Sequence, residues 1–300
     1  MDVKDFLILS ELMKNPFSFY EDIGSGVGLS GVSVGQRIHK MESSGFLQGI
    51  YLIPSPITLG RKAKSYVFTK VRNAKSKLEK VIDIECVVFA WIDHEDDVIV
   101  SLYYESEMEI QESLAMLSSL LGGGYTSVFT PLSLLPPILR LSRYSSIDWK
   151  ILLHMISNPR VSVSEISGRT KLSRKTVLRH RSLMAAGGNL FPVFLMDFNA
   201  AKGAIFYGII AFFENMVAMN SLKEMNLLPV WMMNNPSGAY MLGMALSLTE
   251  VEDIKSKMAK LKGISGYSLS IPAGGVFSTE RVKGWIQDHI DLWRAASFSH

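Results

Sequence analysis

Apolar residues recur at helical spacing in two stretches of the chain, residues 5–47 and 148–190. In both stretches the apolar positions lie three or four residues apart. The same punctuation interrupts them, namely an Asn-Pro pair, a Leu-Ser pair and a glycine. Proline cannot continue a helix, serine caps the start of one, and glycine suits the end of one. Each stretch therefore predicts three short helices, of which the last two form a helix-turn-helix.

The two stretches align without a gap at an offset of 143 residues, the difference between positions 148 and 5. Identical residues fall on the helix-spaced apolar positions and on the punctuation between helices. They include Asp5/Asp148, Ile8/Ile151, Asn15/Asn158, Pro16/Pro159, Ile23/Ile166, Leu29/Leu172, Ser30/Ser173, Val34/Val177, Met41/Met184 and Gly45/Gly188. Self-similarity of this kind indicates an internal structural repeat.

Shorter apolar runs follow each stretch in the order strand, helix, strand, strand, helix, strand. This order occurs over residues 66–132 and again over residues 204–272, with hairpin turns at 93–97 and 234–238. It is the order of the ferredoxin-like βαββαβ sandwich. An amphipathic helix over residues 280–295 closes the chain.

The predicted fold class is α+β, with two winged helix-turn-helix domains, each followed by a ferredoxin-like module, as an internal repeat. The expected domains are a first winged helix (1–58), a first module (59–140), a second winged helix (141–198) and a second module with the C-terminal helix (199–300).

Residues 27–56 resemble the winged helix-turn-helix of the leucine-responsive regulator family, Lrp/AsnC. The likeness rests on the leading Asp5, the Leu29-Ser30 turn, the Arg37-Ile38 pair, Met41-Glu42 and the run from Gly45 to Gly49. The βαββαβ unit is similar to that family's effector and oligomerisation module. The resemblance implies a transcriptional regulator with two consecutive copies of the family's unit. It further implies a homodimer or an intramolecular pseudo-dimer, and a small-molecule effector at a module interface. The turns at 93–97 and 234–238 depart from the family's ligand-pocket pattern.

Cations gather at the start of the third helix of the second copy. Positive charge there opposes the helix dipole, and the phosphates and guanine edges of double-stranded DNA would remove the conflict. The predicted DNA contacts in this copy are Arg169, Lys171, Ser173, Arg174, Lys175, Thr176, Arg179 and His180. Those in the first copy are Ser33, Gln36, Arg37 and Lys40. The alternative is a solvated basic face. Arg181 replaces the core residue Ile38, so it must reach the surface, pair with an acid or face DNA.

Composition limits the remaining chemistry. The net charge is only +3, so a nucleic-acid footprint has to be local. The single cysteine, Cys86, excludes an intrachain disulfide and a cysteine zinc site, and it suits the cytoplasm. The six histidines are scattered, and the most apolar segment, residues 204–213, is too short to span a bilayer. The sequence therefore predicts no metal, no cofactor, no catalytic residues, no membrane partner and no enzymatic activity.

Two other functions stay open. A siroheme decarboxylase resembles this architecture, as paired winged-helix and effector-like units that would be fused here. Its anionic tetrapyrrole needs histidine and arginine, whereas the second module has no arginine between Asn199 and Thr279. The other alternative is a protein-interaction scaffold that has lost DNA binding, which the weak recognition helix of the first copy would allow.

Overall fold

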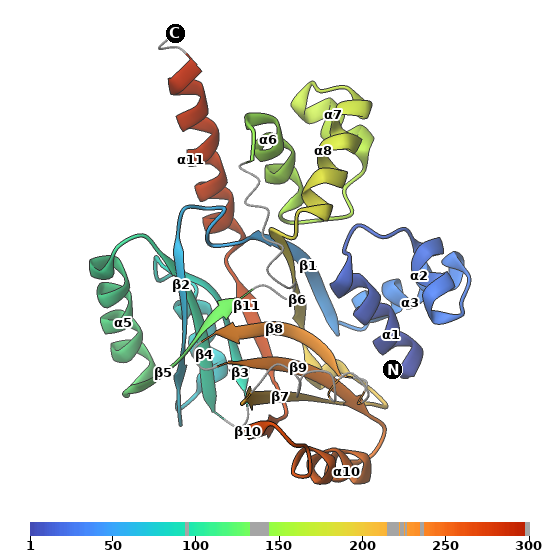
Figure 1. Cartoon of the computed structure of the whole chain (residues 1–300), viewed down its shortest axis with the longest axis vertical. Helices are drawn as coiled ribbons and strands as arrows, with labels where there is room; N and C mark the ends of the chain where they lie inside the picture. The colour runs from blue at the N-terminus through green and yellow to red at the C-terminus, as the bar shows by residue number, and fades with distance from the viewer. Residues whose placement is uncertain are drawn as a thin grey trace.

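The computed structural model of the chain describes residues 1–93, 96–132, 144–214, 222, 225, 227–234 and 237–297. The helices are α1 (Val3–Lys14), α2 (Tyr20–Val27), α3 (Gly31–Ser43), α4 (Ala74–Val81), α5 (Glu107–Leu121), α6 (Ser146–Met155), α7 (Val163–Thr170), α8 (Arg174–Ala186), the 3-10 helix η1 (Phe198–Ala200), α10 (Leu248–Met258) and α11 (Thr279–Ser297) (Figure 1). The strands are β1 (Leu47–Pro54), β2 (Lys62–Phe68), β3 (Val87–Asp93), β4 (Asp97–Tyr104), β5 (Tyr125–Leu132), β6 (Leu190–Met196), β7 (Ile205–Phe213), β8 (Leu228–Asn234), β9 (Gly238–Ala245), β10 (Ile264–Ser270) and β11 (Gly274–Phe277).

Two groups of three helices, α1–α3 and α6–α8, lie where the two aligned stretches predict them. In each group a serine caps the third helix. The hydroxyl of Ser30 or Ser173 accepts a 3.1 Å hydrogen bond from the backbone N–H three residues further on. The second helix ends in a left-handed residue in both groups, Gly28 with φ of 71° and Lys171 with φ of 60°. Equivalent local signals therefore produce equivalent helix boundaries.

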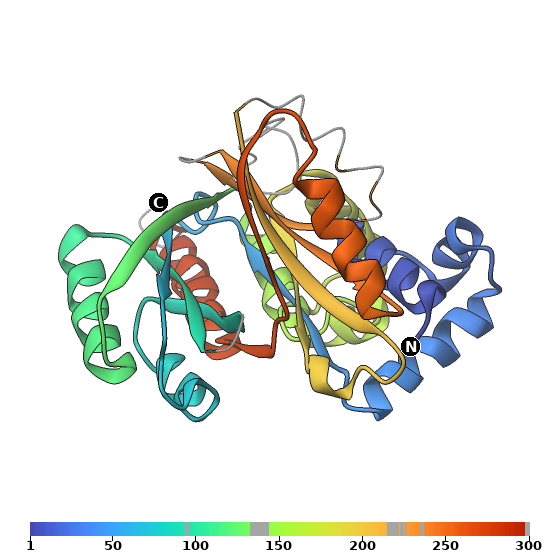
Figure 2. The same cartoon turned by 90° about the horizontal axis from the view of Figure 1, so that it is seen from below.

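Nine strands of the described chain form one sheet in the order β10-β7-β9-β8-β5-β2-β4-β3-β11. Counted along the chain, β2 to β5 have the spatial order 4-1-3-2, and β7 to β10 have the same order. Strand β5 joins the two sets, because its first residues pair with β2 and residues Thr130 to Leu132 pair with β8. Figure 2 shows the first helical group and α5 at opposite ends of the molecule.

Apolar side chains of the two four-stranded sets pack against each other. Trp91 and Ile99 from the first set share a cluster with Met233 and Phe212 from the second. The rings of Trp91 and Tyr240 are 6.0 Å apart. This packing brings strands far apart in the sequence into a common interior.

The strands that follow the two helical groups pair with each other. Strands β1 and β6 are antiparallel, with Leu47 opposite Met196 at one end and Pro54 opposite Leu190 at the other. Leu52 of β1 lies in the core of α6–α8, while Phe194 of β6 lies in the core of α1–α3. The sequence predicts a wing for each copy. The structure combines the two wing strands into one ribbon, which ties each helical group to the other.

The last segment of the chain packs on the first half. Strand β11 lies beside β3, with Gly274 opposite Ile92, and α11 continues beside α6 (Figure 1). Val282 and Ile286 of α11 are fully buried. The expected domain 199–300 includes this segment, which in the structure also contacts β3, the wing strand β6 and α6.

Helices in the described ranges include none that is both long and apolar enough to cross a membrane. Several sequence predictions fall outside the described residues. These are the hairpin residues His94, Glu95, Asn235 and Pro236, and most of the helix expected between the first two strands of the second module.

Candidate nucleic-acid interface

Helix α8 presents a row of exposed cations in its first two turns. Arg174, Lys175 and Arg179 are exposed, and within the described part of the chain none of them forms an ion pair. Lys171, in the turn before the helix, is exposed as well. These side chains keep their full charge at the end of the helix where the dipole is already positive. The surface can therefore attract an anionic partner without first breaking an internal pair.

The hydroxyl groups predicted to touch DNA are engaged at the start of the helix. The Ser173 hydroxyl accepts the hydrogen bond from the Thr176 backbone N–H and lies 2.9 Å from the Thr176 hydroxyl. Arg169, in the last turn of α7, forms an exposed ion pair of 2.8 Å with Glu165. Such surface pairs are worth about 1 kcal/mol or less, so Arg169 can exchange Glu165 for a phosphate.

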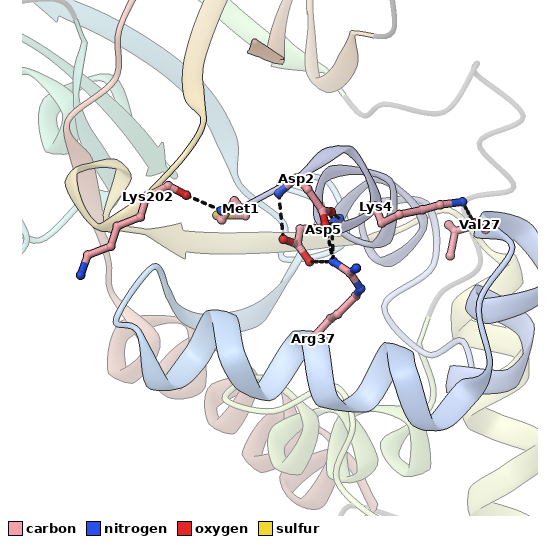
Figure 3. A network of polar contacts seen from close by, with 7 residues as sticks. All are labelled: Met1, Asp2, Lys4, Asp5, Val27, Arg37 and Lys202. Atoms are coloured by element: carbon pink, nitrogen blue, oxygen red, sulfur yellow. Dashed lines mark hydrogen bonds and ion pairs between the residues drawn. The ribbon is translucent and has the colours of Figure 1, made fainter. Parts of the chain in front are cut away.

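Two further ionisable candidates, Arg37 and His180, occupy equivalent positions and point back to the first helix of their groups. His180 Nδ1 lies 2.7 Å from Asp148 Oδ1. Arg37 Nη1 donates to Asp5 Oδ1 at 2.8 Å and to Asp2 Oδ2 at 2.9 Å (Figure 3). Asp5 and Asp148 also serve in the capping boxes of α1 and α6. Both candidates thus brace the recognition helix against the first helix of its group.

The electrostatics of this network favour the ionised forms. Hydrogen bonds to Asp5 and then Asp2 raise the pKa of Arg37. Burial of Asp2 acts in the opposite sense, but its hydrogen bonds with Arg37 and with the Asp5 backbone N–H outweigh it and lower the pKa of Asp2. A lowered carboxyl pKa stabilises the folded chain above the usual value of 3.8 and loses that contribution as the pH falls below it.

We expect Arg37→Ala to destabilise the first helical group by about 1–3 kcal/mol, because it leaves the mostly buried Asp5 carboxylate without its cation. The measurement is the urea midpoint at pH 7 and at pH 3. The difference between variant and wild type should shrink at pH 3, because pH 3 lies below the usual carboxyl pKa of 3.8 and part of the stabilisation from the lowered pKa of Asp2 is lost there. Lys14→Ala is the control, because it removes an exposed pair with Glu11 and should cost about 1 kcal/mol at most. Equal losses in both variants would contradict the bracing role of Arg37.

The first copy presents far less charge on the equivalent face. Gln36 and Lys40 are exposed on α3, and the Ser33 hydroxyl lies 2.9 Å from that of Ser30. Gly31, Val32 and Gln36 stand where the second copy has Arg174, Lys175 and Arg179. The two recognition helices therefore share their caps and differ in their exposed charge.

Direct contacts hold the two helical groups together. Arg160, before α7, donates to the Ser18 carbonyl at 3.0 Å and lies 4.1 Å above the Tyr20 ring. Arg181 donates to the carbonyls of Pro159 and Val161 and lies 5.1 Å from the Phe17 ring. Burial and the nearby charge of Arg160 lower the pKa of Arg181. The structure shows none of the three arrangements expected for Arg181. Backbone carbonyls and an aromatic ring bind its guanidinium instead. Together with the β1–β6 ribbon, these contacts fix the direction of α3 relative to α8.

Sequence reasoning missed Arg160, Asp148 and the ribbon. The acids could have been found, since Asp5 and Asp148 align and so do Arg37 and His180. Across the described residues, no cluster of three His, Cys, Asp or Glu side chains could hold a metal ion.

Comparison with known proteins bears on the helical groups first. A family of winged helix-turn-helix DNA-binding domains matches residues 145–186. The HTH-type transcriptional regulator LrpB of Bacillus subtilis strain 168 is 32% identical over 68 residues, which is 23% of this chain and 46% of LrpB. The chain is Lrp/AsnC-like. The match spans about half the length of that curated relative. E. coli AsnC matches 47% of this Lrp/AsnC-like chain and 96% of its own, with a TM-score of 0.31 and 20% identity.

A second comparison covers almost the whole Lrp/AsnC-like chain. The crystal structure of the siroheme decarboxylase NirDL matches 99% of this chain and 100% of its own, with a TM-score of 0.53 and 12% identity. NirDL in complex with an iron-uroporphyrin III analogue matches 96% of this chain, also with a TM-score of 0.53. The two chains share a fold.

This result corrects the prediction that the chain has no enzymatic activity. The full-length fold is that of an enzyme, so the architecture does not exclude catalysis. The prediction failed because it relied on the absence of a catalytic motif, and sequence order alone does not show which side chains meet in the fold.

Proposed function

We propose that the chain is a double-stranded DNA-binding transcriptional regulator in which α8 is the reading helix. The observation that carries the proposal is the exposed, unneutralised row Arg174, Lys175 and Arg179 at the capped start of a helix-turn-helix. The N-terminal turns of such a helix enter the major groove. Arginine can donate two hydrogen bonds to guanine there, and Thr176 has a methyl group for thymine.

The remaining predicted contacts have supporting roles in this proposal. Lys171 and Arg169 flank the turn and can each contact a phosphate, and the backbone N–H groups near Ser173 can bind another. His180 and Arg37 hold α8 and α3 in position, because Asp148 and Asp5 bind them. In the first copy, Ser33, Gln36 and Lys40 make at most weaker backbone contacts.

The proposal includes the internal duplication. The four expected units, 1–58, 59–140, 141–198 and 199–300, make up two winged helices and two ferredoxin-like modules that pair within one chain as a pseudo-dimer. The β1–β6 ribbon and the contacts of Arg160 and Arg181 support this intramolecular pairing, because they join the two helical groups as a dimer interface joins two subunits. A homodimer of such chains would present two α8 helices to a pseudo-palindromic site. A cytoplasmic location follows from the DNA partner.

The test is fluorescence anisotropy of the full chain on its own promoter fragment and on a random duplex, from low to moderate salt. We expect a preference for the promoter of about a thousandfold. With Arg169, Lys171, Arg174, Lys175 and Arg179 near phosphates or bases, log K should fall against log salt with a slope of about −4. Equal, strongly salt-dependent affinities for both duplexes would mean an architectural binder. No binding at moderate salt would reject the proposal.

A second candidate is a siroheme-decarboxylase-like enzyme. The fold likeness over 99% of the chain favours it. Adding siroheme to the purified chain should then shift the Soret absorption, and the added tetrapyrrole should lose carbon dioxide. An unchanged Soret band would remove this candidate.

A further inference from the structure

A cavity of about 160 Å³ lies where the wing ribbon meets the two strand sets. Its walls come from segments far apart in the sequence. Ile53 of β1 and Val193 of β6 belong to the ribbon, Phe89 belongs to β3, Val230 belongs to β8, and the segment from Pro272 to Phe277 completes the wall. No residue of the DNA surface described above lines it.

The chemistry of the walls is apolar and aromatic. Among the described residues that line the cavity none is charged, and eight are Phe, Tyr or Trp. The Ser101 hydroxyl, one of the few polar groups, is already 2.8 Å from the Ser65 hydroxyl. Burial raises the pKa of Tyr103 and of Tyr240, so both phenols stay neutral.

These walls select a class of ligand. A charged molecule would lose its hydration without gaining a partner, at a cost of several kcal/mol. The walls offer few of the two to four polar partners that an ordered water needs, and a cavity of about 150 Å³ is large enough for benzene. Aromatic rings on several sides favour edge-to-face contacts with another ring.

We propose that this cavity is a binding site for an uncharged aromatic molecule of one or two fused rings. Because its walls include both strands of the ribbon that ties the two helical groups together, occupancy also changes the affinity for DNA. This link to DNA rests on the proposed function, whereas the binding site itself does not.

Isothermal titration of the full chain with indole tests the site, with indole-3-carboxylate as the charged counterpart. Indole should bind, and the carboxylate should bind at least tenfold more weakly. Val193→Phe and Val230→Phe each place a ring in the cavity from a different wall, so each should weaken indole binding at least tenfold. Val32→Phe is the matched control, because Val32 is 73% exposed on α3, and it should leave the affinity unchanged.

Circular dichroism melts establish that each variant is folded before titration. Indole affinity that is equal in wild type and in both folded cavity variants would overturn the proposal. So would tighter binding of the carboxylate, or no indole binding to wild type.

Anisotropy with a labelled promoter separates this inference from the proposed function. Saturating indole should change the DNA affinity of wild type at least threefold and leave that of Val193→Phe unchanged. If indole binds and DNA does not, the proposed function fails and the site stands. If DNA binds and indole does not, the site fails and the proposed function stands. If both bind without influencing each other, the link to DNA is overturned.

Discussion

Replacing Arg174 and Arg179 together by alanine is expected to weaken promoter binding about a hundredfold or more. Each arginine is exposed on the first two turns of α8, and each has its full charge available for phosphate or guanine. A base-contacting arginine contributes about 1–3 kcal/mol, which is roughly tenfold to a hundredfold in affinity. Anisotropy at fixed salt measures the loss. The slope of log K against log salt should also become shallower by about 2, because two cations no longer contact the DNA.

The matched control lies in the first copy of the repeat. Gln36 aligns with Arg179, and Lys40 lies one turn further along α3. Gln36→Ala combined with Lys40→Ala should change promoter affinity by less than about fivefold, since it removes one exposed charge and no paired contact. Equal losses in the two double variants would show that both recognition helices read DNA. No loss in either would favour the scaffold alternative.

Ile286→Ala is expected to cost about 2–5 kcal/mol of stability, the largest single-residue effect we predict for folding. Ile286 is fully buried in the cluster that joins α11, α6 and the wing strand β1. Truncation removes buried methyl groups and leaves a cavity between elements that cannot close independently. The measurement is the urea midpoint followed by tryptophan fluorescence, because Trp149 and Trp285 lie in or against the same cluster.

Leu292→Ala on the same helix is the control for this second prediction. Leu292 is 67% exposed, so its loss should shift stability by no more than about 0.5 kcal/mol. If Ile286→Ala were as mild as Leu292→Ala, α11 would contribute little to holding α6 on the first module.

The helices of the two groups could be predicted because local chain signals decide their ends. Ser30 and Ser173 cap α3 and α8 as their positions in the repeat predict. Exposed cations on α8 follow from the same helical spacing. These features depend on neighbours within four residues, which a single sequence displays.

Strand partners could not be predicted in the same way. Strand β1 finds β6 about 140 residues later, and β11 is a run of four residues, from Gly274 to Phe277, with two glycines. Neither sequence pattern specifies which distant strand the segment will pair with. Charge has the same ambiguity, because the sequence marks Arg37 and His180 as candidate DNA contacts and does not show that Asp5 and Asp148 also bind them.

The pairing of β11 with β3 affects how the chain folds while it is being synthesised. Strand β4 ends at Tyr104 and β11 begins at Gly274, 170 residues later by the difference of their numbers. At a synthesis rate of roughly 5–20 residues per second, the outer edge of β3 waits about 9–34 s for its last partner. During that interval an emerging chain carries an unpaired strand edge, the feature that promotes aggregation. We therefore expect the ribosome-bound first half, with the outer edge of β3 unpaired, to associate edge to edge more readily than the folded protein.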